Sequence, residues 1–114
     1  YLSFTATGKK KAIVLDWETN NEIDNLAFNI YRATSEDGEK IKINPEMIPS
    51  ASPGGTEGAV YSYTDTMGGT TGLRPNIEYY YWLQDVPTSG DGDFYGPVTA
   101  HLPLGKNNVT KKIK

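Results

Sequence analysis

Residues 73–83 read Leu-Arg-Pro-Asn-Ile-Glu-Tyr-Tyr-Tyr-Trp-Leu and join a turn directly to an alternating strand. The proline interrupts regular structure, and four positions later the aromatic residues begin at Tyr79. Because side chains alternate across a strand, every second residue from Tyr79 to Leu83 shares one face, and Tyr80 and Trp82 share the other. We expect the first set to face a core and the second to face outward.

The same alternation recurs along the chain, and turn signals separate the segments that carry it. The segments predicted as strands are residues 1–7, 11–18, 26–33, 39–44, 60–65, 77–86 and 94–102. The apolar residues predicted to face inward are Ile13, Leu15, Trp17, Leu26, Phe28, Ile30, Ile41, Ile43, Val98, Ala100 and Leu102. Residues 45–59 contain prolines and a Gly-Gly pair and are expected to form a loop.

Composition favours an all-β domain. Twelve glycines and seven prolines among 114 residues imply many turns, and a chain of this length can bury one adequate core. We expect a single domain over residues 1–103 and a polar, lysine-rich tail or linker over residues 104–114.

Charge and cysteine content exclude several classes of protein. The formal net charge is -3, and no basic stripe is present that could neutralise a row of phosphates, so nucleic acid is not an expected partner. The absence of cysteine excludes thiol catalysis and disulfides. No apolar run approaches the length of a membrane span, so membrane insertion is not expected.

The order of motifs resembles that of a fibronectin type III domain. The segments that carry the resemblance are Leu15-Asp16-Trp17, Phe28-Asn29-Ile30-Tyr31-Arg32, Tyr63-Thr64-Asp65, the stretch from Leu73 to Leu83, and Gly96-Pro97. The resemblance implies a seven-stranded, antiparallel, immunoglobulin-like β-sandwich. In it the second and fifth strands face the third, sixth and seventh. It also implies a corner in which a buried tyrosine hydroxyl bonds to the backbone upstream.

The sequence of residues 17–32 is similar to that of fibronectin-type modules in bacterial secreted or cell-surface proteins. That similarity implies a non-catalytic extracellular module that acts as a spacer or docks neighbouring domains or protein subunits. One alternative is a self-assembling filament or pilus subunit, in which residues 1–7 or 107–114 pair with a neighbour. Another alternative is an accessory carbohydrate-binding module.

An outward-facing set of aromatic residues is the candidate interaction face. It consists of Tyr31, Tyr80 and Trp82, together with His101. Cross-strand pairing that only stabilises the sheet is the preferred interpretation. Contact with a neighbouring domain or subunit comes next, and stacking on polysaccharide comes last.

Catalysis has no support in the sequence. His101 is the only histidine, and alternation from Val98 places it on the outer face of the last strand. No serine lies in a nucleophile-elbow context. We therefore expect neither an enzyme nor a cofactor.

Acidic residues near the last turn raise the question of calcium. Asp91 and Asp93 flank a glycine, with Asp85 and Ser89 nearby, and calcium prefers several oxygen ligands on a flexible loop. The spacing lacks the full ligand series, so a plain turn is the preferred interpretation and no metal is expected. The acidic loop with Glu18, Glu22 and Asp24 has a weaker claim of the same kind.

One modification signal is present. Asn108-Val109-Thr110 fits an N-glycosylation acceptor within the predicted tail. It matters only if the protein is exported by an organism that glycosylates such sites.

Overall fold

The computed structural model describes residues 1–66 and 72–103, which contain eight β-strands and no helix. The strands are β1 (Ser3–Gly8), β2 (Ala12–Glu18), β3 (Ala27–Ala33), β4 (Ile41–Lys42), β5 (Ile48–Pro49), β6 (Val60–Thr66), β7 (Tyr79–Val86) and β8 (Phe94–Ala100). It follows that, within these two ranges, no helix is long and apolar enough to cross a membrane.

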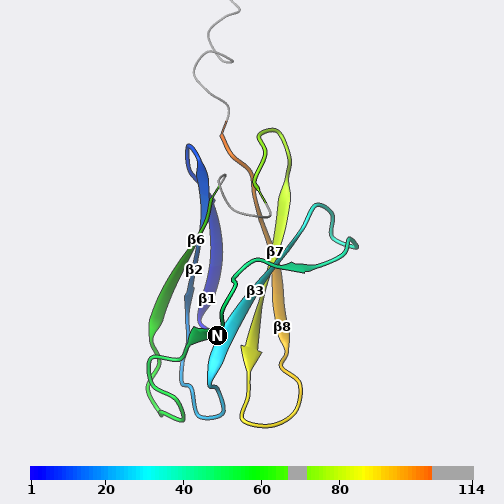
Figure 1. The fold of residues 1–114 in the computed structure, drawn as a ribbon. Helices are drawn as coiled ribbons and strands as arrows, with labels where there is room; N and C mark the ends of the chain where they lie inside the picture. The colour runs from blue at the N-terminus through cyan, green and yellow to red at the C-terminus, as the bar shows by residue number, and fades with distance from the viewer. Residues whose placement is uncertain (67–71, 104–114) are drawn as a thin grey trace, which may run out of the picture.

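The strands form two antiparallel sheets that lie face to face (Figure 1). The first sheet has the order β1-β2-β6, and the second has the order β4-β3-β7-β8, with β5 also paired to β3. The prediction that the second and fifth segments face the third, sixth and seventh is therefore confirmed. Residues 45–59, predicted as a loop, contain the additional short strand β5.

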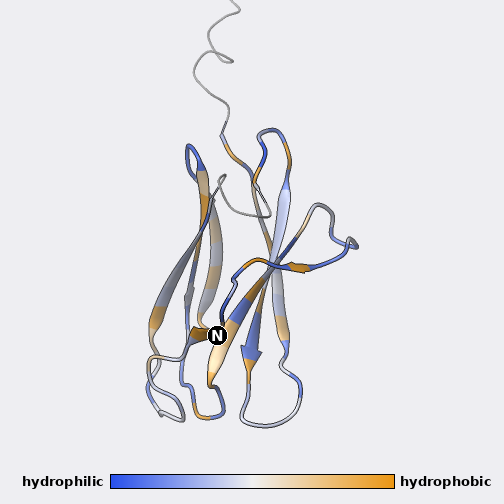
Figure 2. Cartoon of the chain, in the orientation of Figure 1, coloured by the Kyte–Doolittle hydropathy of each residue, from blue (hydrophilic) through white to orange (hydrophobic). Residues whose placement is uncertain are grey.

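A single core lies between the sheets. The inward residues of β2 (Ile13, Leu15 and Trp17) and those of β3 and β7 belong to one buried cluster. Figure 2 shows hydrophobic bands on both sheets. Val98, Ala100 and Leu102 also face this cluster, as predicted. The arrangement is that of a β-sandwich, because the apolar faces of two sheets bury each other.

A buried ion pair crosses the core. Arg32 on β3 donates a hydrogen bond from Nη1 to Oδ2 of Asp65 on β6 at 2.5 Å, and both side chains are almost inaccessible to solvent. The hydroxyl of Tyr81 on β7 donates to the same carboxylate oxygen at 2.8 Å. Burial, followed by the negative charge of Asp65, raises the pKa of Tyr81 well above its ordinary value. The phenol therefore stays protonated, and this polar network joins the two sheets.

The turn before β7 is closed by a buried tyrosine. The backbone N–H of Arg74 donates to the hydroxyl oxygen of Tyr79 at 2.7 Å, and Leu73 is buried beside the core. Asn76 has a φ of 66°, a left-handed conformation that asparagine tolerates better than most residues. The corner expected from the resemblance is thus present in its local geometry.

Two residues predicted to face inward are largely exposed. Leu26 is 47% exposed and Ile41 is 49% exposed. Leu26 precedes β3, and its backbone is held by bonds to Val86 and Ser50 rather than by the β3 ladder. Ile41 lies on β4, a two-residue strand at the edge of the larger sheet, where only β3 pairs with it. The predicted tail and Asn108 lie outside the described residues.

We expect Tyr79→Phe to lower the free energy of unfolding by about 1–2 kcal/mol, because the N–H of Arg74 loses its partner. Urea denaturation followed by fluorescence measures this difference. Tyr80→Phe is the matched control on the adjacent position and should change stability by less than about 0.5 kcal/mol. Equal losses in the two variants would show that the corner hydrogen bond does not stabilise the fold.

Candidate functional site

The predicted interaction face lies on the outer side of the larger sheet. Tyr31 on β3 is directly opposite Trp82 on β7, and Tyr80 is opposite Thr99 on β8. Directly paired residues in an antiparallel sheet share a face. The structure therefore brings Tyr31 and Trp82 together and places Tyr80 on the same side.

Trp82 is covered rather than exposed. Only 5% of its surface is accessible, and the ammonium nitrogen of Lys40 lies 4.4 Å from the centre of its ring. Phe94 meets Tyr31 edge to face, with ring centroids 5.1 Å apart. In the cluster of Tyr31, Lys40, Trp82 and Phe94, called here the outer cluster, Trp82 is covered while Phe94 stays partly exposed.

An irregularity in β8 places Phe94 in the outer cluster. The register shifts by one residue between Tyr81 and Leu83, so that Leu83 pairs with Tyr95 and Gln84 pairs with Phe94. A one-residue bulge reverses which side chains face outward beyond it. Tyr95 consequently turns toward the inner side, where its ring lies 4.3 Å from that of Tyr1.

Sequence reasoning missed Phe94 and Lys40. Period two counted back from Val98 places Phe94 on the inner face, and only the bulge corrects this assignment. Lys40 immediately precedes β4, and alternation within that segment does not show that its ammonium group lies over Trp82 of β7. The Gly-Pro pair at residues 96–97 was the one available signal of a break in the strand.

His101 is separate from the outer cluster. Its Nδ1 lies 3.0 Å from Oε1 of Glu78, and both side chains are substantially exposed at the end of the sheet. The outward position of His101 agrees with the prediction. The contact is a surface pair between an imidazole and a carboxylate, and such exposed pairs contribute little stability.

Polar side chains extend the outer face toward the other end of the sheet. Gln84 accepts hydrogen bonds at Oε1 from Asn29 Nδ2 at 3.2 Å and from the Tyr31 hydroxyl at 3.3 Å. Asn44 donates to Asn29 at 3.0 Å and accepts from the backbone N–H of Ile30 at 2.7 Å. These bonds fix the side chains beside the outer cluster, so the face is preorganised.

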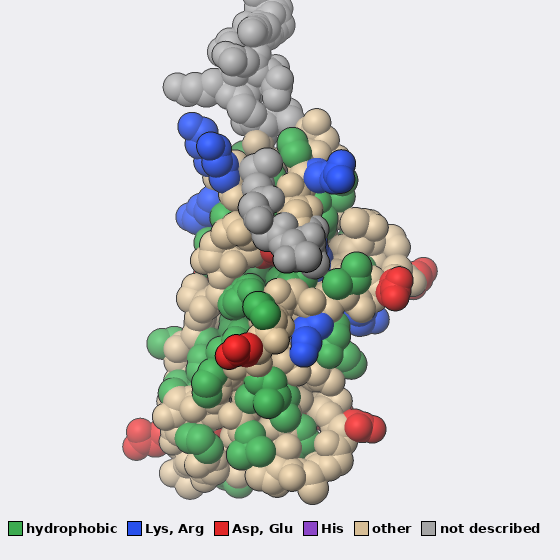
Figure 3. Space-filling view, in the orientation of Figure 1, with side chains coloured by type: hydrophobic (Ala, Val, Ile, Leu, Met, Phe, Trp, Pro, Cys, Tyr) green, Lys and Arg blue, Asp and Glu red, His purple; other side chains and the backbone are tan. Residues whose placement is uncertain are grey.

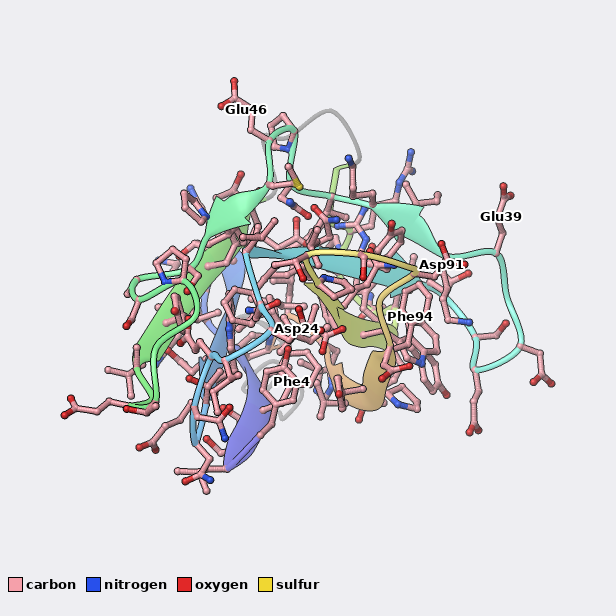
Figure 4. The ribbon with its side chains drawn as sticks, turned by 90° about the horizontal axis from the view of Figure 1, so that it is seen from below. Phe4, Asp24, Glu39, Glu46, Asp91 and Phe94 are labelled. Atoms are coloured by element: carbon pink, nitrogen blue, oxygen red, sulfur yellow. The ribbon has the colours of Figure 1, made fainter. Side chains whose placement is uncertain are left out.

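The acidic residues considered for calcium line an open depression of about 360 Å³ between two loops. Asp85 Oδ1 accepts a hydrogen bond from the backbone N–H of Asp93 at 2.8 Å, as in a plain turn. Asp24 accepts from both the N–H and the hydroxyl of Thr88, which lowers the pKa of this carboxylate. In the view from below, Asp91 lies on the same side as Phe94, with Asp24 nearer the middle (Figure 4). Across residues 1–66 and 72–103, no group of three or more histidine, cysteine, aspartate or glutamate residues could hold a metal ion.

Glu22 is buried in this region although its neighbours are exposed. Its carboxylate accepts hydrogen bonds from Thr19 Oγ1 at 2.7 Å, from the Tyr61 hydroxyl at 2.6 and 2.7 Å, and from Ser50 Oγ. Only 1% of the residue is accessible to solvent. These partners come from three separate segments of the chain, so Glu22 holds the β2–β3 loop against the start of β6 and the residues after β5.

The protonation of Glu22 follows from these donors. Burial by itself would raise the pKa of the carboxyl, but the hydrogen bonds from Ser50, Tyr61 and Thr19, with the backbone N–H of Ser52, act in the opposite direction. The net result is a pKa below the ordinary value. Glu22 is therefore a structural anion, and its carboxylate is enclosed by donors of this chain rather than open to a ligand.

Comparison with protein-family models and with curated proteins finds no match to this chain. The chemistry of the site is that of packed aromatic rings, one covering ammonium group and satisfied amides. Such a surface can contact another protein through its rim, where Phe94 remains 46% exposed.

We expect Trp82→Ala to destabilise the fold by about 3 kcal/mol, because a buried indole is removed. Lys40→Ala is the matched variant, since it only uncovers the ring, and it should cost about 0.5–1 kcal/mol. Thermal and urea unfolding measure both. A Trp82→Ala protein of unchanged stability that no longer binds polysaccharide would instead identify the indole as a ligand platform.

We expect Glu22→Gln to lower the free energy of unfolding at pH 7 by about 2 kcal/mol, because an amide cannot accept all of the hydrogen bonds that a carboxylate accepts. The folded pKa lies below the unfolded value, so the stabilisation is present above about pH 4.5 and is lost as the pH falls through the folded pKa. Urea unfolding at pH 7, 5 and 3 should show the two proteins converging.

Glu46→Gln is the control for this series, because Glu46 points away from the molecule (Figure 4). It should have little effect at any of these pH values. A Glu22→Gln difference that stayed constant down to pH 3 would contradict the assignment of Glu22 as a structural anion.

Proposed function

We propose that the chain is a non-catalytic, immunoglobulin-like module of the fibronectin type III kind that spaces or docks other protein domains. The observation that carries the proposal is the hydrogen bond from the Arg74 N–H to the buried Tyr79 hydroxyl at the turn before β7. A tyrosine corner of this kind is a hallmark of immunoglobulin-like sandwiches. The division of the strands into the orders β1-β2-β6 and β4-β3-β7-β8 supports the same proposal.

The path of the chain suits a spacer. β1 begins in the lower half of the molecule in Figure 1, and β8 runs upward to the residues at the upper end. Force applied along the chain would therefore act along the strands of a sandwich. The buried Arg32–Asp65 pair, which joins β3 to β6, would resist separation of the two sheets.

The same features favour a structural role over catalysis or glycan binding. The ring of His101 pairs with Glu78 on the surface, and the carboxylate of Glu22 is occupied by structural donors. A sugar-stacking platform needs accessible aromatic faces, and Trp82 is buried beneath Lys40. An extracellular or cell-surface location belongs to this proposal through the resemblance alone.

Single-molecule stretching of a chain that contains several copies of this domain tests the proposal. We expect each copy to unfold in one cooperative step and to lengthen by about 30 nm, since roughly 100 folded residues extend to about 0.34 nm each and the folded domain already spans roughly 4 nm of that length. A protein that extended gradually, without discrete unfolding events, could not serve as a stiff spacer. Asp65→Asn should lower the unfolding force, because it weakens the bond between the sheets.

A further inference from the structure

The β6 strand is an open edge of the smaller sheet. The order β1-β2-β6 places β6 at its end, and β5 pairs with β3 instead of with β6. The opposite edge strand, β1, lies against β8, and β8 itself carries a bulge. Among the described strands, β6 is therefore the long, regular edge that no neighbouring strand covers.

Hydrogen bonding shows which residues of β6 face the open edge. The N–H of Thr19 donates to the C=O of Ala59 at 3.0 Å, one pair beyond the pair of Glu18 and Val60. Bonded and non-bonded pairs alternate in an antiparallel ladder. The backbone groups that point away from β2 are therefore those of Val60, Ser62, Thr64 and Thr66.

The open edge has little of the usual protection against pairing. Natural edges are blocked by lysine, proline, bulges or inward-pointing charges. Residues 60–66 read Val-Tyr-Ser-Tyr-Thr-Asp-Thr and contain neither lysine nor proline. The single charge, Asp65, is neutralised by Arg32 in the core. The residues that face the edge are β-branched or small, and Val60 is 75% exposed, so a second strand can approach.

The distribution of charge along β6 favours a second copy of this chain as the strand that pairs with the open edge. Lys9, Lys10 and Lys11 form the exposed turn between β1 and β2, at the end where β6 finishes. Glu18 and Glu57 lie at the opposite end, where β6 begins. Figure 3 shows lysine and arginine side chains at the upper end of the molecule and acidic side chains at the lower end, with both signs at mid-height. An antiparallel copy brings each basic end beside the acidic end of its partner.

We propose that β6 pairs antiparallel with β6 of a second copy, so that two three-stranded sheets form one continuous sheet of a two-fold symmetric dimer. With Tyr63 on the symmetry axis, Val60 lies opposite Thr66 and Ser62 lies opposite Thr64 of the second copy. Every backbone group that faces the edge then has a partner. The turn of Lys9–Lys11 then lies at the same end of the joined sheet as Glu57 of the second copy, so opposite charges face each other and attract most strongly at low salt. This inference goes beyond the proposed function and does not depend on it.

The primary test compares Thr64→Pro with Thr64→Val by analytical ultracentrifugation over a wide concentration range at low salt. Proline removes an edge-facing N–H without touching the β2 ladder, whereas valine keeps the N–H and the side-chain shape. We expect the original protein and Thr64→Val to dimerise, and Thr64→Pro to raise the dimer dissociation constant at least tenfold while circular dichroism stays unchanged. A protein that is monomeric throughout, or a folded Thr64→Pro protein that dimerises as well as Thr64→Val, would overturn the proposal.

A charge exchange tests the orientation of the copies and keeps the proposal testable if the proline variant does not fold. Glu57→Lys and Lys10→Glu should each weaken dimerisation at least threefold. The double variant should recover it, because both symmetric contacts are restored with reversed sign. Failure of the double variant to recover would exclude the antiparallel arrangement. Hydrogen exchange adds an independent measurement, since the N–H groups of Ser62 and Thr64 should become protected only at high protein concentration.

Discussion

The bridge between Arg32 and Asp65 constrains the rest of the structure. A buried charge without a partner is costly, so β3 and β6 must approach each other at the one alignment that pairs these side chains. The hydroxyl of Tyr81 donates a hydrogen bond to the carboxylate of Asp65 and so fixes β7 in the same alignment. Apolar packing alone tolerates shifts of one sheet over the other, because hydrophobic contact has little directionality. The ion pair supplies the missing directionality and fixes how the two sheets are superposed.

Polar groups also organise both ends of the sandwich. At one end, the carboxylate of Glu22 accepts hydrogen bonds from three segments and so holds the loops around the start of β6. Near the other end, the hydroxyl of Tyr79 closes the turn that precedes β7. The aromatic residues of the larger sheet stabilise it on both faces, since Tyr81 is buried inside and Trp82 is buried beneath Lys40 outside. At Tyr81 and Trp82 the larger sheet is therefore covered on both faces, whereas β6 of the smaller sheet keeps a free edge.

Much of the fold could be predicted because alternation is a local property. Ile13, Leu15 and Trp17 are two residues apart, and a strand necessarily places them on one face. The prediction that Leu26 and Ile41 are buried was wrong. Burial depends on which segment packs against a side chain, and the local pattern does not show where the facing sheet ends. In the candidate site, the outward position that Tyr31 and Trp82 share could be predicted, because alternate residues of a strand lie on the same face. The covering of Trp82 by Lys40 could not, because it depends on how two segments far apart in the chain, the one before β4 and β7, lie against each other.

The sequence by itself determined an all-β chain, the faces of its central strands and the corner before β7, since each follows from neighbours within a few residues. The tertiary structure decided what required distant partners. The bulge in β8 turned Phe94 outward and Tyr95 inward, and burial among donors made Glu22 a structural anion rather than a surface carboxylate. Only the order of strands in the sheet could leave β6 at an open edge, because pairing is a relation between segments far apart in the chain.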